Sequence, residues 1–139
     1  LFAEPRTQFH SPDLIISIGV PSPDSLQRWM ADNSPHLLVD IGSRSEVRVG
    51  PYVIPGKTPC FRCVQLTESS EWSFSPSCDV SSALSLSVAG AIAHDVISLS
   101  DLHTSIYLAT SYIHSNRNYS QPEIQHWSQH HACGCSWGG

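Results

Sequence analysis

The stretch "DLIISIGVPSPDSLQRWMADNSPHLLVDIGS", residues 13–43, contains two short apolar runs separated by an amphipathic segment. The first run, residues 13–20, ends at a proline and is typical of a strand buried on both faces in a parallel sheet. Between the runs, Ser22 suits a helix N-cap and Pro23 suits the first helical position. The second run, residues 36–43, has the same character as the first. The stretch therefore predicts a βαβ unit whose first strand is central in its sheet.

Further elements follow along the chain. Residues 45–60, "SEVRVGPYVIPGKTPC", alternate valines with polar residues until Gly50-Pro51 breaks the pattern, which predicts a hairpin-like arm. Residues 79–99 predict a long helix capped by Asp79, rich in small residues that suit close packing. Residues 104–115 and 122–129 predict two strands. The order predicts an α/β class: a partial Rossmann-like sheet, with parallel strands followed by antiparallel strands, and a single domain over residues 1–139.

Composition excludes several classes of function. A net charge of -5, with only seven Lys and Arg in 139 residues, argues against a nucleic-acid partner. No run of about 18 apolar residues is present, which argues against a membrane span. The start "LFAEPRTQFH" lacks the basic and apolar regions of a secretion signal. These features favour a soluble, cytoplasmic protein.

The cysteines form two close pairs near opposite ends of the chain. Cys60 and Cys63 form a CxxC, Cys133 and Cys135 form a CxC, and the fifth cysteine is Cys78. An odd number argues against a disulfide framework, whereas two pairs supply the four soft donors that zinc prefers. A redox CxxC belongs at a helix start, but this one follows Pro59 in what the sequence indicates is a loop. The favoured interpretation is a four-cysteine zinc clamp; reduced core thiols and disulfides are the alternatives.

This clamp predicts a structural role for the metal. Four thiolates close the coordination shell, so zinc would hold the C-terminal tail on the loop at residues 59–64. Gly134 is expected to let the CxC turn fold tightly enough for both sulfurs to face one ion. His126, His130 and His131 lie near the second pair, and any of them is an alternative ligand.

Cys78 is the one candidate for a reactive thiol. It precedes Asp79, just outside the predicted helix N-terminus, an environment that lowers a thiol pKa. The simpler interpretation, which we favour, is an ordinary small residue at the end of a loop. No catalytic residue is therefore assigned.

These features together resemble the ThiF/MoeB-like, ubiquitin-activating-type adenylating superfamily. Members carry an arm with a pattern like G-x-V-x-P-G-x-x-P-C-x-x-C, matched here by Val53, Pro55, Gly56, Pro59, Cys60 and Cys63. The resemblance implies the C-terminal half of such a fold, within a longer protein. The segments "VGPYVIPGKTPCFRC" and "HWSQHHACGCSW" resemble the ThiF-like partner proteins of YcaO cyclodehydratases, which deliver a precursor peptide in natural-product biosynthesis.

The chain also departs from that superfamily. It contains no GxGxxG-like phosphate-binding turn, and residues 17–21 carry Val20 where the family has an acidic magnesium ligand. We therefore expect a non-catalytic module that acts as scaffold or partner in modification of a peptide or small carrier protein. The alternatives are the C-terminal fragment of an ATP-dependent adenylating enzyme and a structural zinc domain without separable activity.

The sequence also predicts a homodimer. The strand at residues 13–20 would have an uncovered edge, and the small-residue helix at residues 81–97, with Ala89, Gly90 and Ala93, would allow close approach of a second chain. Trp72 and Phe74 are expected to anchor that interface.

Overall fold

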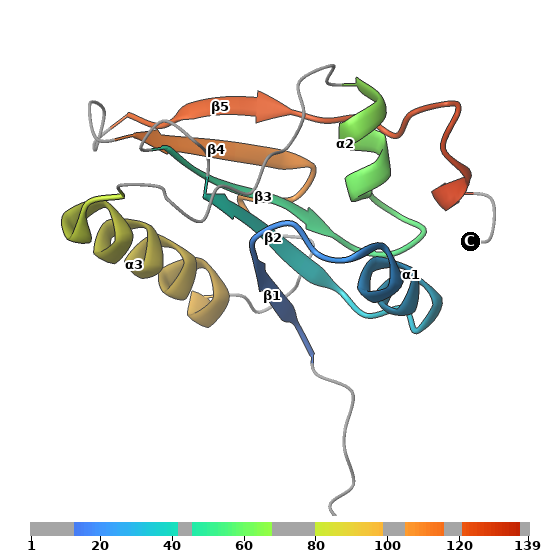
Figure 1. Ribbon diagram of the computed structural model, residues 1–139, viewed down its shortest axis with the longest axis horizontal. Helices are drawn as coiled ribbons and strands as arrows, with labels where there is room; N and C mark the ends of the chain where they lie inside the picture. The colour runs from blue at the N-terminus through green and yellow to red at the C-terminus, as the bar shows by residue number, and fades with distance from the viewer. Residues whose placement is uncertain (1–12, 42–45, 68–79, 99–104, 116–120, 137–139) are drawn as a thin grey trace, which may run out of the picture.

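The structure, a computed structural model, describes residues 13–41, 46–67, 80–98, 105–115 and 121–136. Within these ranges the elements are β1 (Ile15–Ile18), α1 (Pro23–Ala31), β2 (His36–Ile41), β3 (Glu46–Val53), α2 (Phe61–Thr67), α3 (Ser82–Ser98), β4 (Thr110–Ser115) and β5 (Glu123–His126), and Gly134–Ser136 forms a 3₁₀ turn. The five strands form one sheet in the order β1-β2-β3-β4-β5 (Figure 1). β1 and β2 are parallel and the later pairs are antiparallel. The predicted α/β class is confirmed.

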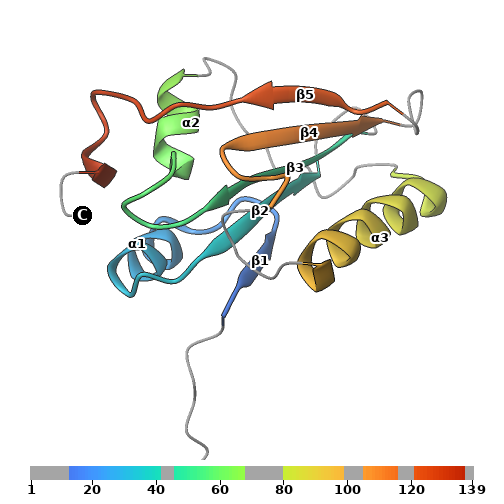
Figure 2. The same cartoon turned by 180° about the vertical axis from the view of Figure 1, so that it is seen from behind.

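Helices cover both faces of this sheet. α3 lies on one side, and α1 and α2 lie on the other (Figures 1 and 2). Alternation along β2 sends Leu37 and Val39 to the α3 face, where they join the larger apolar cluster. Leu38 faces the other way, toward Leu26 and Met30 of α1 and the cysteines. The second cluster therefore places the cysteines against the α1/α2 face.

α1 forms as its sequence predicts. The Ser22 side chain accepts a hydrogen bond from the Ser25 N–H at 3.2 Å, and Pro23 occupies the first turn. Asn33 follows the helix with a φ of 53°, and the Ser34 N–H reaches back to the Trp29 carbonyl at 2.8 Å. This left-handed turn leads the chain directly into β2.

The prediction of a central, doubly buried first strand is wrong. β1 lies at the edge of the sheet, and within the described residues it pairs only with β2. The side chains of Ile16 and Ile18 are 43% and 70% exposed. An apolar run shows that a strand has two apolar faces, but it does not show how many neighbouring strands the same chain supplies.

β3 continues through the point where the sequence predicted a break. It runs to Val53 across the cis Gly50-Pro51 peptide, and β2 accommodates it with a register shift between Leu37 and Val39. Gly50 has a φ of 100°, and a Cβ there would overlap the carbonyl oxygen of Thr110. Only glycine therefore allows β3 and β4 to approach this closely.

α3 confirms the predicted helix. The Ser81 side chain accepts the Leu84 N–H at 3.1 Å, and the predicted cap, Asp79, lies outside the described residues. The buried residues of α3 are Leu84, Val88 and Asp95, whereas Leu86 and Ile97 are 74% and 84% exposed. The Asp95 carboxylate accepts hydrogen bonds from Ser105 and Ile106, which joins the end of α3 to the segment before β4.

The two later strands are shorter than predicted. β4 begins only at Thr110, and β5 ends at His126. The expected interface anchors Trp72 and Phe74 lie outside the described residues, as do Cys78 and Asp79. No helix in the described ranges has both the length and the apolar character needed to cross a membrane.

Replacing Gly50 by alanine should destabilise the fold by about 2 kcal/mol or more, because both the positive φ and the Thr110 carbonyl oppose a side chain. Gly90→Ala is the matched control: a Cβ there meets no atom within 4 Å, so the free energy of unfolding should rise by about 0.5–1 kcal/mol. Urea unfolding curves measure both changes. Equal stability of the two variants would contradict this account of β3.

Candidate metal centre

A tight turn and the short helix α2 place the first cysteine pair. The Lys57 and Thr58 N–H groups both donate to the Ile54 carbonyl, and the Thr58 hydroxyl oxygen accepts the Ile54 N–H at 2.9 Å. The chain then enters α2, whose first helical hydrogen bond runs from the Val64 N–H to the Cys60 carbonyl. The predicted loop position of the CxxC is therefore wrong: Cys60 immediately precedes α2, and Cys63 lies in its first turn.

β5 brings the second cysteine pair to the same place. Thr110 pairs with His126, and the next residue, Trp127, donates its indole N–H to the Ser111 hydroxyl at 2.8 Å. The chain then turns, with the Cys133 N–H donating to the His130 carbonyl at 2.9 Å. Trp127 is 6% exposed, so this buried anchor aims the C-terminal segment at α2.

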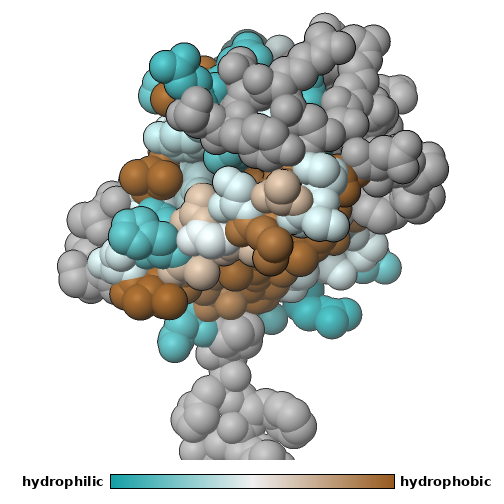
Figure 3. Space-filling model, turned by 90° about the vertical axis from the view of Figure 1, so that its left-hand side faces the viewer, coloured by the Kyte–Doolittle hydropathy of each residue, from teal (hydrophilic) through white to brown (hydrophobic). Residues whose placement is uncertain are grey.

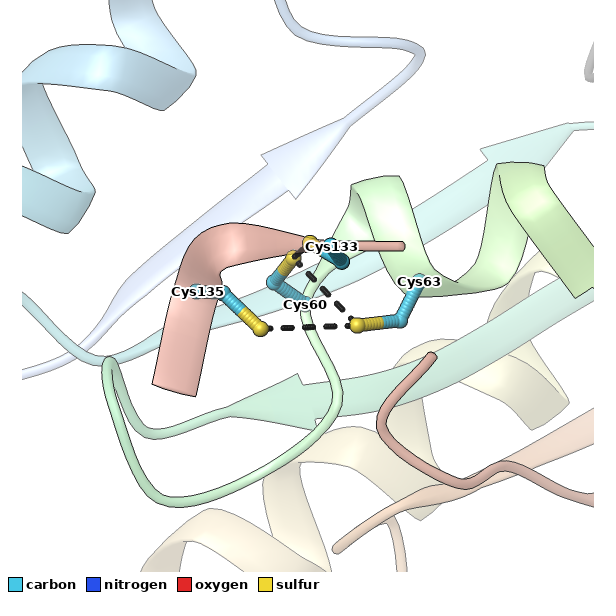
Figure 4. Close-up of side chains that lie close together, drawn as sticks. All are labelled: Cys60, Cys63, Cys133 and Cys135. Atoms are coloured by element: carbon cyan, nitrogen blue, oxygen red, sulfur yellow. Dashed lines mark hydrogen bonds between the residues drawn. The ribbon is translucent and has the colours of Figure 1, made fainter. Parts of the chain in front are cut away.

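The four sulfur atoms lie together between α2 and the C-terminal turn (Figure 4). The sulfur of Cys60 is 3.8 Å from that of Cys63 and 3.5 Å from that of Cys133. The Cys63 and Cys135 sulfurs are 3.4 Å apart, and all four lie within 4.8 Å of one another. A zinc ion about 2.3 Å from each of four sulfurs holds them about 3.8 Å apart, so this donor set fits a tetrahedral thiolate site.

Burial and local hydrogen bonds shift the pKa values of the cluster's thiols in different directions. Burial raises the pKa of the Cys60 thiol to about 11, and burial also raises the pKa of Cys135. Burial opposes ionisation of Cys63 as well, but hydrogen bonds from the His130 and Cys60 backbone and from neighbouring thiols outweigh it, and the Cys63 pKa is lowered. Negative charge therefore settles first on Cys63, and a bound metal would displace the protons of its neighbours.

Two of the alternatives weighed from the sequence, disulfides and a histidine ligand, fit less well than a four-cysteine site. The sulfurs are 3.4 Å or more apart in the three contacts, whereas a disulfide needs about 2.05 Å, and all four cysteines are free. The metal-competent group found among the described residues contains no histidine. His126 instead contacts the Thr110 hydroxyl, and the His130 Nδ1 accepts the Ala132 N–H.

The expected need for Gly134 is not borne out. A Cβ on Gly134 would meet no atom within 4 Å, and the residue lies in a 3₁₀ turn that other residues adopt readily. The structure thus brings together Cys60, Cys63, Cys133 and Cys135 as predicted, with three of them buried. That they hold a metal stays a prediction. A four-thiolate site has no open position for substrate, so its chemistry is structural.

Two residues with evident roles were not singled out from the sequence. Trp127 orients the cysteine-bearing segment, and its only sequence signal is an aromatic residue within the strand predicted at residues 122–129. His36 is fully buried at the start of β2, beside a cavity between α1 and α2. Side chains alternate between the two faces of a strand, so His36 and Leu38 of β2 are predicted to share a face. No sequence pattern predicts the cavity beside them.

Comparison with solved structures shows a shared fold. Escherichia coli MccB bound to ATP aligns with a TM-score of 0.64 and 16% identity, over 89% of this chain and 39% of that chain. E. coli MccB alone aligns with a TM-score of 0.65 and 15% identity, over 88% of this chain and 39% of that chain. The microcin C7 biosynthetic enzyme MccB in complex with N-formylated MccA aligns with a TM-score of 0.60 and 17% identity. The alignment covers 89% of this chain and 41% of that chain.

The chain therefore spans about two fifths of the length of these MccB chains. No protein-family model and no curated protein sequence matches it. At this identity the likeness establishes the fold, not the activity.

Cys63→Ser should release the C-terminal segment, because the contact closes across 72 residues and the other described anchors of this segment are few. Metal affinity should fall about a hundredfold or more. Limited proteolysis with mass spectrometry should then find new cuts beyond Ile124. Gly134→Ala, between the two ligands, is the control and should keep both metal and protection. Unchanged protection in Cys63→Ser would argue against the clamp.

Proposed function

We propose that the chain is a zinc-binding, ThiF-like module without catalytic residues of its own, acting as a scaffold or partner in the modification of a peptide or small carrier protein. The observation that carries this proposal is the fold shared with MccB, a microcin C7 biosynthetic enzyme whose solved complex includes N-formylated MccA. The arm "VGPYVIPGKTPCFRC", which resembles ThiF-like proteins, forms β3, the turn and the start of α2 in this fold.

Zinc is the metal that suits the site. Four thiolates in tetrahedral reach favour zinc over hard cations such as magnesium or calcium, which prefer oxygen ligands. The ion would fix α2 against the C-terminal turn and leave the chemistry to another component. We further propose that residues 1–139 form one domain, equivalent to the C-terminal half of a ThiF-like fold within a longer protein. A cytoplasmic location suits it, because a reducing compartment keeps thiols available for metal.

The partner we propose is a YcaO cyclodehydratase. This rests on the resemblance of "HWSQHHACGCSW" to the tails of ThiF-like proteins that accompany these enzymes. In such a pair the present chain would deliver the precursor peptide and the YcaO protein would form the azoline ring.

Reconstitution tests this role. A YcaO cyclodehydratase from the same organism, with its precursor peptide and ATP, should convert peptide at least about tenfold faster when the zinc-loaded chain is added. Mass spectrometry follows the loss of water that accompanies ring formation. Cys63→Ser should remove the stimulation and Gly134→Ala should keep it. Equal conversion with and without the chain would contradict the scaffold role.

A second candidate is the C-terminal fragment of an ATP-dependent adenylating enzyme, which acts on a sulfur-carrier or ubiquitin-like protein. It is favoured by the solved complex of MccB with ATP and by the partial length that this chain covers. One observation argues against catalysis by this chain. The residues that follow β1 are Gly19, Val20 and Pro21, and none of them has a carboxylate that could bind magnesium.

The isolated chain should therefore not bind ATP. Titration calorimetry with ATP and magnesium should give no measurable heat up to millimolar nucleotide, because neither a phosphate-binding glycine turn nor the acidic ligand is present in the sequence. Micromolar affinity would favour the adenylating candidate over the scaffold.

We also propose a homodimer through the β1 edge and α3. Ile16 and Ile18 of β1 and residues of α3 border an apolar groove of about 180 Å³. Hydrophobic side chains gather on this side of the molecule, over α3 and β1 (Figure 3). A second copy would cover the groove, with the outward positions Ala89, Gly90 and Ala93 of α3 allowing close approach.

Light scattering at micromolar concentration should give about twice the chain mass of 15.2 kDa. Ala93→Trp, on the exposed side of α3, should weaken association about tenfold because its bulk prevents close approach. Gln125→Trp on β5, at the opposite edge of the sheet from β1, serves as a control and should leave the mass unchanged. A mass near 15.2 kDa for all three proteins would exclude the dimer.

A further inference from the structure

A cavity of about 500 Å³ opens on the α1/α2 face of the sheet, next to the sulfur cluster. Its apolar wall comes from the β1–α1 connection, from α1 and from the start of α2: Val20, Pro21, Pro23, Leu26, Met30 and Phe61. Sites for small ligands typically have volumes of about 300–1,000 Å³ and mainly apolar walls with a few polar groups. The size and lining of this cavity therefore suit a small organic group.

His36 supplies a buried hydrogen-bond acceptor at this cavity. Its side chain is fully buried, and its Nδ1 is 2.9 Å from the Ser34 carbonyl oxygen. A carbonyl only accepts, so Nδ1 carries the proton. Burial lowers the pKa of His36, which keeps the ring neutral and leaves a lone pair on Nε2.

That lone pair has no partner among the residues that the structure describes. The Nε2 of His36 makes no hydrogen bond to them, and the Trp29 ring, with its centroid 5.3 Å away, packs beside the imidazole. His36 is one of the residues that line the cavity, and Nε2, which is closed to solvent in this structure, is its polar ring atom without a partner. Buried acceptors are nearly always satisfied, so an unpaired one beside a cavity points to a donor supplied by a ligand.

The rim of the cavity is polar and carries one cation. Gln27, Arg62 and Gln65 line it and are exposed. Within the ranges that the structure describes, Arg62 has no ion-pair partner, and its guanidinium is suited to a carboxylate. The lining of the cavity therefore includes a buried histidine with an unpaired acceptor, apolar walls and an exposed cation.

We infer that this cavity binds a ligand with a mainly apolar body, an N–H or O–H donor that reaches the Nε2 of His36, and a carboxylate that pairs with Arg62. An N-acylated tyrosine has this chemistry, either as a small molecule or as the C-terminal residue of a peptide. The inference goes beyond the proposed function and stands without it, because it depends only on the cavity and its polar groups.

Three small-molecule probes, titrated into the full chain, separate the contribution of the donor to binding from that of the carboxylate. N-acetyl-tyrosine should bind about fivefold more tightly than N-acetyl-phenylalanine, which lacks the donor, and more tightly than N-acetyl-tyrosinamide, which lacks the carboxylate. Titrations followed by NMR give the affinities. The ¹⁵N resonance of His36 Nε2 should shift with the tyrosine probe and not with the phenylalanine probe.

Two variants assign the contacts. In His36→Asn the asparagine side chain can still donate to the Ser34 carbonyl, but it has no acceptor at the position of Nε2. The preference for N-acetyl-tyrosine over N-acetyl-phenylalanine should therefore vanish. Arg62→Gln should lower affinity for N-acetyl-tyrosine and leave that for the amide unchanged. Arg28→Gln, on α1 but outside the cavity, is the control. If His36→Asn does not fold, Leu26→Trp narrows the cavity from α1 and should abolish binding of all probes.

The source of the ligand is distinguished by a fourth probe. The tripeptide Gly-Gly-Tyr should bind more tightly than N-acetyl-tyrosine if the site takes a peptide C-terminus, and equally if it takes a small molecule. Failure of every probe to bind at millimolar concentration, or equal affinity for tyrosine and phenylalanine without a His36 shift, would overturn the inference.

Discussion

The contact between two cysteine pairs, 72 and 73 residues apart in the chain, fixes the C-terminal segment. That segment leaves the sheet after His126. It is held by the Trp127 indole, by the Trp127 N–H that donates to the Ala109 carbonyl, and by the sulfur cluster. The same cluster fixes the start of α2, since Cys60 immediately precedes this helix and Cys63 lies in its first turn. Because Phe61 also lines the cavity beside His36, any ion that binds the sulfurs would stabilise that wall too.

Local signals predicted most of the fold. Ser22, Pro23 and the two apolar runs specify β1–α1–β2 through capping and strand periodicity, which act within a few residues. The predictions fail where contacts with distant parts of the chain determine the local structure. Gly50 looked like a break, but its use depends on the Thr110 carbonyl of β4, and the edge position of β1 depends on strands that other segments do or do not supply.

The candidate site was predictable in its residues but not in its setting. Donor chemistry and spacing were sufficient to group Cys60 and Cys63 with Cys133 and Cys135, since few other residues offer soft ligands. The short helix α2 has no strong periodic signal, so the CxxC was assigned to a loop. His36 carried no motif, because its unpaired Nε2 follows from tertiary packing of Trp29 and Ser34 around the ring.

X-ray absorption at the zinc edge, on protein purified without added metal, tests the central claim most directly. Four thiolates around one ion per chain predict a single shell of four sulfurs at about 2.3 Å and no nitrogen or oxygen in that shell. A protein without zinc, or a shell in which nitrogen or oxygen replaces sulfur, would contradict the four-cysteine clamp.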